Sequence, residues 1–294
     1  MKFGYKVITA LLILSLLLSS CGGDSAFFTR PELDGFSRGA VTGSFETIVY
    51  SIAKADAILL MTENHTVIID AGDVNNSGPM MDYLLAAGRQ TVDCLIITHF
   101  HKDHVGGAAK LFDFLEIRQV VVPDYTVDTE FYAAFKQQLD AAPEIPVTVL
   151  GGGADLDFFF DDVQFNVTSS KKGIEDMTEK GENNMSLVTT AWHGDKTFLY
   201  PGDVMASRIA EMIRRSDLAA DYLKFPHHGA ADTGNKPLLD AVNPEYTVVT
   251  DSNKWPIDDE FNTILDAAEG QWYSTRDGVV YCVSDGQKLS IWQE

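Results

Sequence analysis

Short apolar runs separated by polar turns dominate the chain from about residue 45 to residue 150. Each run has the length of a single β-strand, and Gly, Asn or Asp residues lie between many of them. This pattern is typical of strands that are buried on one or both faces of a sheet. It predicts strands at residues 45–52, 56–61, 66–70, 92–97, 119–122 and 147–150.

Apolar residues at helical spacing fill several of the segments between these strands. A helix is predicted at residues 80–87, where Gly88 can adopt the left-handed conformation that ends many helices. Two more helices are predicted at residues 103–115 and 128–140. Because strands and helices alternate, the pattern favours a layered α/β fold.

Hairpins are more frequent in the second half of the chain. One is predicted at residues 156–167, turning at Asp161 and Asp162, and another at 187–200, turning at 193–196. Two β-rich halves are compatible with a sandwich of two sheets. The remaining predicted elements are helices at 205–215 and 236–242 and strands at 222–225, 246–250, 279–283 and 289–292.

The first 42 residues have a different pattern, which is typical of export. Two lysines precede an apolar run at residues 7–18, and the sequence Leu18-Ser-Ser-Cys21 follows, as in a bacterial lipoprotein signal. We therefore expect a signal peptide at 1–20, a lipid on Cys21, a tether at 21–42 and one domain at 43–294. The protein would then be anchored outside the cytoplasmic membrane, or in the outer membrane of a diderm cell. A plain secretory signal or a membrane anchor is the alternative.

The charge of the chain is strongly acidic. Among the 294 residues, 22 Lys and Arg face 43 Asp and Glu, for a formal net charge of −21. Such a surface repels polyanions and argues against tight nucleic-acid binding, which depends on basic contacts to phosphates. It leaves room for a small phosphoester held by metal ions. Cys94 and Cys282 lie in apolar runs, and we expect two separate buried thiols.

A cluster of potential metal ligands is the strongest chemical signal in the sequence. Directly after the strand predicted at 92–97, six residues contain His99, His101, Asp103 and His104. His99 and His101 leave an extended backbone on the same face, so one ion can take both. A second ion can take Asp103 and His104, and Asp103 can also cap the helix that follows. Imidazole and carboxylate suit zinc, and also manganese or iron.

Later segments supply further ligands. Asp203 follows an apolar strand and is the candidate to bridge two ions. His227 and His228 follow another strand; we favour His228 as a ligand of the second ion, with His227 as the alternative. Asp70 is placed to orient a ligating imidazole through its other ring nitrogen. The two remaining histidines fall in predicted turns and are expected to be solvent-exposed: His65 and His193.

These motifs resemble those of metallo-β-lactamase-fold hydrolases. The resemblance covers the whole predicted domain and rests on Asp70-Ala-Gly72, His99-Phe-His-Lys-Asp-His104, Gly202-Asp203 and His227-His-Gly229. Residues 55–60, 183–188, 223–229 and 277–281 most resemble the corresponding domain of competence DNA-uptake channel proteins. The family implies an αββα sandwich of two mixed sheets with helices on the outer faces. It also implies two metal ions at the sheet edge and hydrolytic chemistry, with nuclease or phosphodiesterase activity proposed for this branch.

One position departs from the common family pattern. Many members supply a third histidine for the first ion, whereas here Asn183 or Asn184 falls near that place. An amide oxygen is a weaker ligand for zinc than imidazole. The first ion would then be loosely held, or be manganese, or be absent. Asn184 is the candidate ligand, and capping of local backbone is the alternative for both amides.

The leading hypothesis is an extracytoplasmic metal-dependent hydrolase of a phosphodiester or phosphoester. A hydroxide bound to two divalent ions, zinc first and manganese or iron as alternatives, would attack, with Asp103 orienting it. Lys171 and Lys172 are candidates to meet a substrate phosphate. A lactone, thioester or β-lactam hydrolase is the second hypothesis, and a non-catalytic cell-surface binding lipoprotein is the third.

Overall fold

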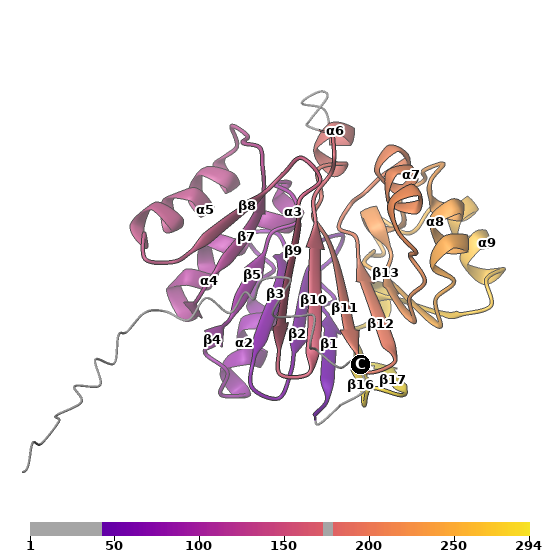
Figure 1. Cartoon of the computed structure of the whole chain (residues 1–294), viewed down its shortest axis with the longest axis horizontal. Coiled ribbons are helices and arrows are strands. Elements are labelled where there is room, and N and C mark those ends of the chain that lie inside the picture. Colours follow the sequence, from indigo (N-terminus) through magenta and orange to yellow (C-terminus); the bar gives the residue numbers. More distant parts are fainter. Residues whose placement is uncertain (1–42, 173–178) are drawn as a thin grey trace, which may run out of the picture.

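Two mixed β-sheets lie face to face at the centre of the molecule (Figure 1). The computed structural model describes residues 43–172 and 179–294. The predicted signal peptide and tether, residues 1–42, lie outside this range and stay predictions. Across the described ranges, no helix combines the length and the apolar character that crossing a bilayer requires.

The first sheet joins the start of the domain to its end. Its strand order is β17-β16-β1-β2-β3-β5-β7-β8, antiparallel from β17 to β3 and parallel from β3 to β8. A separate two-stranded sheet pairs β4 (Thr91–Val92) with β6 (Glu116–Ile117). The strands of the first sheet are β1 (Phe45–Val49), β2 (Ala57–Met61), β3 (Thr66–Ala71), β5 (Cys94–Ile96), β7 (Val120–Pro123), β8 (Val147–Leu150), β16 (Val280–Ser284) and β17 (Leu289–Gln293).

The second sheet comes from the middle of the chain. Its order is β15-β14-β13-β12-β11-β10-β9, with the two predicted hairpins forming the antiparallel part and β12 to β15 running parallel. Its strands are β9 (Asp155–Phe160), β10 (Val163–Thr168), β11 (Val188–His193), β12 (Lys196–Tyr200), β13 (Tyr222–Lys224), β14 (Tyr246–Val249) and β15 (Gln271–Ser274).

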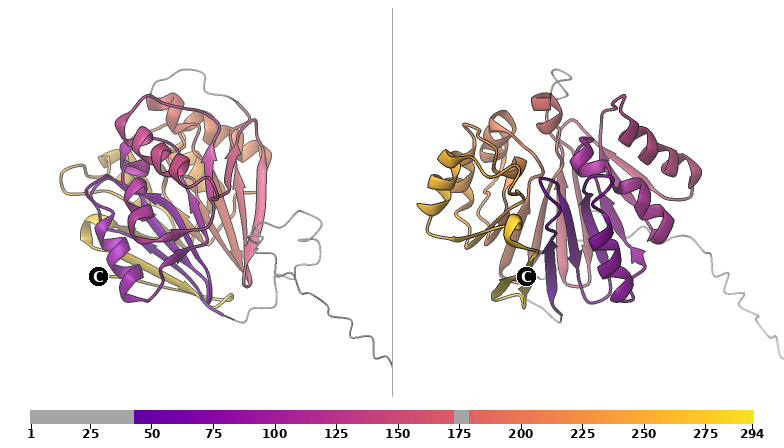
Figure 2. Two further views of the ribbon diagram at one scale, coloured as in Figure 1. Left: turned by 90° about the vertical axis from the view of Figure 1, so that its left-hand side faces the viewer. Right: turned by 180° about the vertical axis from the view of Figure 1, so that it is seen from behind.

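Helices cover the outer faces of both sheets, on opposite sides of the molecule (Figures 1 and 2). The predicted αββα sandwich is therefore confirmed. Helices α2 (Gly78–Ala86), α3 (Lys102–Val105), α4 (Ala108–Phe114) and α5 (Glu130–Ala141) accompany the first sheet. Helices α7 (Ala206–Arg215), α8 (Asn235–Val242) and α9 (Asp259–Asp266) accompany the second. The short segments are α6 (Glu179–Asn183), η1 (Pro226–Gly229) and η2 (Thr275–Asp277).

The apolar core has three layers, one between the sheets and one under each set of helices. Strand β10 shows how the pattern produces the middle layer. Val163, Phe165 and Val167 are fully buried, while the residues between them are half-buried on the other face. Strands β2 and β3 are buried throughout because core residues cover both of their faces, so they appear in the sequence as continuous apolar runs.

The helix predicted at 103–115 is two helices, and its start is different. His101 is the N-cap of α3, so the prediction that Asp103 caps the helix is wrong. The break falls at Gly106 and Gly107. A Cβ on Gly107 would lie 2.2 Å from the carbonyl oxygen of Ala71, so only glycine lets the backbone pass this close to β3. Helix α9 and strand β15 were not predicted.

Two histidines are less exposed than predicted. His193 is completely buried, and its Nδ1 lies 2.9 Å from the Ser284 hydroxyl of β16. His65 is half-buried, with its ring stacked on Phe160 and Nδ1 3.2 Å from the Asp161 carboxylate. His65 precedes β3 and His193 is the last residue of β11, next to the hairpin turn, but strands distant in sequence pack over both. The prediction of exposure is therefore wrong for His193 and only partly met for His65.

The cysteines are as predicted. Cys94 and Cys282 are buried and separate, and they form no disulfide. Burial raises the pKa of the Cys282 thiol to about 12, so it stays protonated at neutral pH. Neither thiol is therefore placed to act as a nucleophile.

Candidate metal centre

The predicted ligands come together at one edge of the sandwich, where strands from both sheets end. His99 follows β5 of the first sheet, whereas Asp203 and His228 follow β12 and β13 of the second. The sheets approach closely here, since a Cβ on Gly202 would lie 2.9 Å from the Cβ of Thr98. Groups more than a hundred residues apart in sequence therefore meet in a small volume.

Asp203 lies between three of the imidazoles. Its Oδ2 is 3.2 Å from His104 Nε2, 3.3 Å from His228 Nε2 and 4.0 Å from His99 Nε2. Asp103 completes one side of the group, with Oδ2 3.5 Å from His228 Nε2. The carboxylate of Asp203 therefore occupies the central position that a bridging ligand requires.

His99 and His101 form the other side of the group. Their rings leave the same face, and His99 Nε2 lies 3.0 Å from His101 Nδ1. His101 Nε2 points toward Glu182 of α6, at 3.8 Å from Oε1. The chain thus presents a pair of imidazoles beside Asp203 for a first ion, and Asp103, His104 and His228 for a second.

Two imidazole nitrogens in the ligand group form no hydrogen bond with the other ligands and are free to coordinate a divalent ion. The Nε2 atoms of His104 and His228 are buried, and neither forms a hydrogen bond. Buried polar atoms that form no hydrogen bond are costly, and they are rare in folded proteins. Both atoms lie among the grouped ligands, where a cation would satisfy them. The fold and this donor set together imply divalent metal binding.

Asp70 holds the group from behind, as expected for a residue that orients a ligand. Its Oδ2 lies 2.7 Å from His104 Nδ1. It also accepts hydrogen bonds from the Thr98 backbone N–H and hydroxyl, at 2.8 and 2.7 Å. The Thr98 hydroxyl in turn lies 3.0 Å from His99 Nδ1. One buried carboxylate therefore fixes two imidazoles with their Nε2 atoms facing Asp203.

The charges within the group are strongly coupled. Burial lowers the pKa of His104, but the carboxylates of Asp203 and Asp70 outweigh it and raise the pKa well above its ordinary value. The pKa of His228 is raised in the same way, mainly by Asp203 and Asp56 against the effect of burial. Burial raises the pKa of Asp203, but His104 and His228 lower it well below its usual range. Protons and metal ions therefore compete for the same nitrogens.

We expect metal binding to release protons at neutral pH. The neighbouring carboxylates raise the pKa values of His104 and His228 without metal, so protons compete with an ion for both rings and are released when it binds. Affinity should then increase with pH by about tenfold per unit for each displaced proton. Titration calorimetry in two buffers of different ionisation enthalpy measures the protons released. A binding enthalpy that is independent of the buffer would contradict the expectation.

The backbone of the His-His-Gly segment is strained. His227 and His228 have φ values of 49° and 54°, in the left-handed region that side chains other than glycine rarely adopt. Such strain is concentrated at functional sites. His228 faces the ligand group, whereas His227 lies beside it, with its backbone N–H 3.1 Å from Asp203 Oδ1 and Nε2 3.2 Å from Asn183 Nδ2. The geometry favours His228 over His227 as the ligand.

The structure corrects the expectation for Asn184. Its amide oxygen accepts hydrogen bonds from the backbone N–H groups of Met205 and Arg208, at the start of α7. A carbonyl oxygen has two lone pairs, so both are in use and none is left for an ion. Asn183 is the better candidate, because it is fully buried and its amide oxygen has no hydrogen bond.

An open pocket of about 360 Å³ leads to the ligands. Two lysines lie in its wall: Lys54 is half-buried, and Lys102 is 3.1 Å from Asp73. Within the described ranges, no carboxylate lies within ion-pair distance of Lys54. Lys171 and Lys172, which the sequence suggested, are not in this wall. No sequence pattern pointed to Lys54, since a lone lysine in a loop is common.

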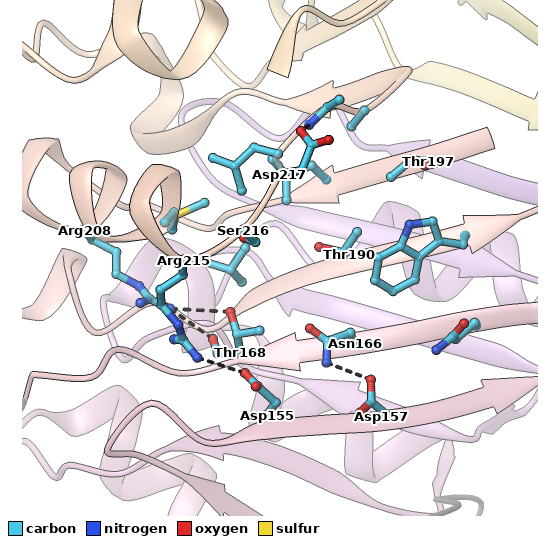
Figure 3. A pocket seen from close by; sticks show the side chains of 18 residues that line it. Asp155, Asp157, Asn166, Thr168, Thr190, Thr197, Arg208, Arg215, Ser216 and Asp217 are labelled. Carbon is cyan, nitrogen blue, oxygen red and sulfur yellow. Dashed lines mark hydrogen bonds and ion pairs between the residues drawn. The ribbon is translucent and has the colours of Figure 1, made fainter. Parts of the chain in front are cut away.

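A second cavity, of about 510 Å³, lies between α7 and the outer face of the second sheet (Figure 3). Its charged groups pair within the wall: Arg215 reaches Asp155 at 3.3 Å, and Asn166 donates to Asp157 at 2.8 Å. None of the predicted ligands lines it. The Arg215 contact connects α7 to the sheet, whereas the Asn166 bond joins β10 to β9. The candidate metal site belongs to the pocket at the sheet edge.

Comparison with known proteins supports the same assignment. Residues 54–249 match the family described as the Metallo-beta-lactamase superfamily. The chain is 26% identical over 172 residues to ComE operon protein 3 of Bacillus subtilis (strain 168), covering 58% of this chain and 21% of that protein. It is 25% identical over 227 residues to Competence protein ComA of Neisseria gonorrhoeae, covering 75% and 28%. The chain thus spans less than a third of the length of either relative.

A solved structure has the same fold. The metallo-beta-lactamase fold protein YhfI of Bacillus subtilis superposes with a TM-score of 0.53 at 11% identity, covering 84% of this chain and 100% of that one. The predicted resemblance to this fold, and to competence proteins within it, is confirmed. From its sequence, its fold and its grouped ligands, the chain belongs to the metallo-beta-lactamase superfamily of metal-dependent hydrolases.

Proposed function

We propose that the protein is an extracytoplasmic hydrolase of a phosphodiester or phosphoester that uses two divalent ions, zinc by preference. The observation that carries this proposal is a pair of lysines in the pocket wall, beside the candidate ligands Asp103 and Asp203 and the carboxylate of Glu182. The lysines are Lys54 and Lys102, in a chain with a formal net charge of −21. Positive groups at the mouth of a metal site in an acidic protein favour a small anionic substrate. The similarity to competence proteins supports the same choice.

The chain's own residues have distinct tasks in this proposal. When bound, two divalent ions lower the pKa of water from about 15.7 to about 7 and polarise a phosphoryl oxygen. Asp203 would hold both ions, and Asp103 would orient the attacking oxygen by accepting a hydrogen bond from it. Lys54 holds a non-bridging oxygen of the substrate. No serine or cysteine nucleophile is needed, which agrees with the buried thiols.

Location is part of the proposal and rests on the sequence of residues 1–42 alone. A lipid on Cys21 would hold the domain at the outer surface of a membrane, with residues 21–42 as the spacer. Mass spectrometry of the mature amino terminus tests this directly. A chain that still begins at Met1, or an unmodified thiol at Cys21, would contradict it.

One set of assays separates the proposed function from its alternatives. Elemental analysis after purification without chelator should give close to two ions per chain, and less than about 0.2 would favour the non-catalytic binding lipoprotein. The metal-loaded protein should hydrolyse bis(p-nitrophenyl) phosphate faster than nitrocefin or an acyl lactone. The weak ligand position at Asn183 argues against lactone and thioester substrates, since those branches normally carry a histidine there. Faster turnover of nitrocefin or of the lactone would overturn the phosphoester assignment.

Replacing Lys54 should affect anionic substrates selectively. In Lys54→Met, we expect the KM for bis(p-nitrophenyl) phosphate to rise about three- to tenfold, because one partly exposed charge contact contributes about 1 kcal/mol. Turnover of a neutral ester should be unchanged. Lys136→Met is the matched control, since Lys136 lies on α5, outside the pocket, and pairs with Asp140. Equal effects of the two substitutions would contradict a substrate contact.

A further inference from the structure

A buried ion pair lies directly behind His228. Asp56, in the loop before β2, bonds to Lys224 at the end of β13, and both side chains are at most 1% exposed. Lys224 is four residues before His228 in the chain, whereas Asp56 is far away in sequence. Removing two charges from water costs several kcal/mol, so such a pair is weak evidence for a stabilising role.

Thr250 connects this pair to the ligand. Its hydroxyl oxygen lies 2.6 Å from Asp56 Oδ1 and 2.9 Å from His228 Nδ1, and its side chain is completely buried. Thr250 follows β14, which pairs with β13 in parallel. Hydrogen bonds therefore link four side chains in one network. Three of them come from the edge of the second sheet and one from the loop before β2: His228, Thr250, Lys224 and Asp56.

The direction of each hydrogen bond in this network is determined. A hydroxyl has a single proton, and an ionised carboxylate can only accept. Asp56 accepts hydrogen bonds from both Lys224 and the Thr250 hydroxyl, so the Thr250 oxygen must accept from His228 Nδ1–H. The proton of the neutral imidazole is then on Nδ1. The lone pair of Nε2 consequently faces Asp203 and Asp103, 3.3 and 3.5 Å away.

Asp56 also contacts the backbone of a second candidate ligand, Asp103. The Asp56 backbone N–H donates to the carbonyl oxygen of Asp103 at 3.0 Å, and the Asp56 carbonyl accepts from Gly72 N–H at 2.7 Å. Thr98 and Asp70 make an equivalent hydroxyl–carboxylate pair behind His99. His99 and His228 thus each have Nδ1 beside a threonine hydroxyl that donates to a buried aspartate, and the two threonine–aspartate pairs come from different parts of the chain.

We propose that Asp56, Lys224 and Thr250 are positioning residues that hold His228 in its ligating tautomer and thereby determine the affinity of the second metal ion. This inference rests on the metal centre and is independent of the substrate class. Groups that orient a ligating histidine typically change metal affinity by about 10- to 100-fold when removed.

The hydroxyl of Thr250 gives the sharpest test. In Thr250→Val, which keeps shape and burial, zinc affinity at one of the two sites should fall about 10- to 100-fold by chelator competition. Thr250→Ser should restore it. The control is Thr189→Val, because Thr189 is also completely buried in the second sheet and its hydroxyl has no hydrogen bond. That control should bind zinc as the unmodified chain does.

A spectroscopic measurement separates positioning from folding. The visible spectrum of the cobalt-loaded protein should change in Thr250→Val and return in Thr250→Ser, while far-ultraviolet circular dichroism stays constant in all three variants. Unchanged zinc affinity and an unchanged cobalt spectrum in Thr250→Val would overturn the inference. An equal loss of affinity in Thr189→Val would overturn it as well, since burial alone would then explain the effect.

The ion pair is tested by removing both charges together. Asp56→Val/Lys224→Met replaces the pair with apolar groups, which is often neutral or stabilising for a buried pair. We expect a folded protein whose zinc affinity has fallen by a similar factor. Loss of folding, or undiminished affinity, would overturn the positioning role of Asp56 and Lys224. Phosphoester hydrolysis is not a readout here, so failure of the proposed substrate class remains distinguishable from failure of this inference.

Discussion

Asp203→Asn should abolish most activity and deplete the bound metal. The amide has the same size, but it lacks the negative charge that three imidazole nitrogens surround at 3.2, 3.3 and 4.0 Å. Both proposed ions share this carboxylate, so its loss weakens both at once. We expect kcat/KM for bis(p-nitrophenyl) phosphate to fall by at least about 10³-fold, the upper end of the cost of losing one preorganised electrostatic group. Elemental analysis should show fewer ions per chain.

The control for this substitution is Asp73→Asn. Asp73 lies near the same edge of the sandwich and pairs with the exposed Lys102, but it is not in the ligand group. Its metal content should be unchanged and its activity should stay within about fivefold of that of the unmodified chain, because an exposed ion pair contributes at most about 1 kcal/mol. Full metal occupancy in Asp203→Asn would show that the carboxylate does not bridge the ions.

Local spacing was sufficient to predict the parts of the site that follow a strand directly. His99, His101 and His104 stand in one short segment, and the pattern of buried strand followed by polar residues placed them at a sheet edge. Asp203 and His228 were found for the same reason. The structure shows that these three segments meet at one point. From the sequence, the only indication of this meeting was that parallel strands end at a common edge of a sheet.

Residues whose role depends on a distant partner were missed or misjudged. Asn184 resembles a ligand in sequence, but the start of α7 takes its oxygen. His193 sits at a hairpin turn, yet β16 covers it. Thr250 and Lys54 are common residue types without a local motif, so no spacing distinguishes them from ordinary core or loop residues. Asp56 lies in the segment 55–60 that resembles competence proteins, but that resemblance gave it no role.

The strand pattern predicted the sandwich well because buried residues alternate along β10 and along most of β11. Helix α9 was missed although Phe261 and Leu265 are four apart and Asp258 caps its first turn, accepting from Glu260 N–H at 3.0 Å. The short run at β15 is half-exposed and flanked by charged residues, which weakens its signal. Edge elements bury less apolar surface, and so their sequences constrain the structure less.

Phe165→Ala should lower the free energy of unfolding by about 3–5 kcal/mol. The ring is fully buried in the layer between the sheets; it stacks on Phe158 with centroids 5.0 Å apart and meets Phe45 of the first sheet edge-on at 6.0 Å. Its removal leaves a cavity that two rigid sheets close only partly, so the lost contacts are not replaced. Phe114→Ala is the control, because Phe114 is 56% exposed at the end of α4 and should cost less than about 1 kcal/mol. Urea unfolding with excess chelator measures both, since bound metal would otherwise add its own stabilisation. Equal midpoints for the two variants would mean that the interface between the sheets does not carry the stability that its packing indicates.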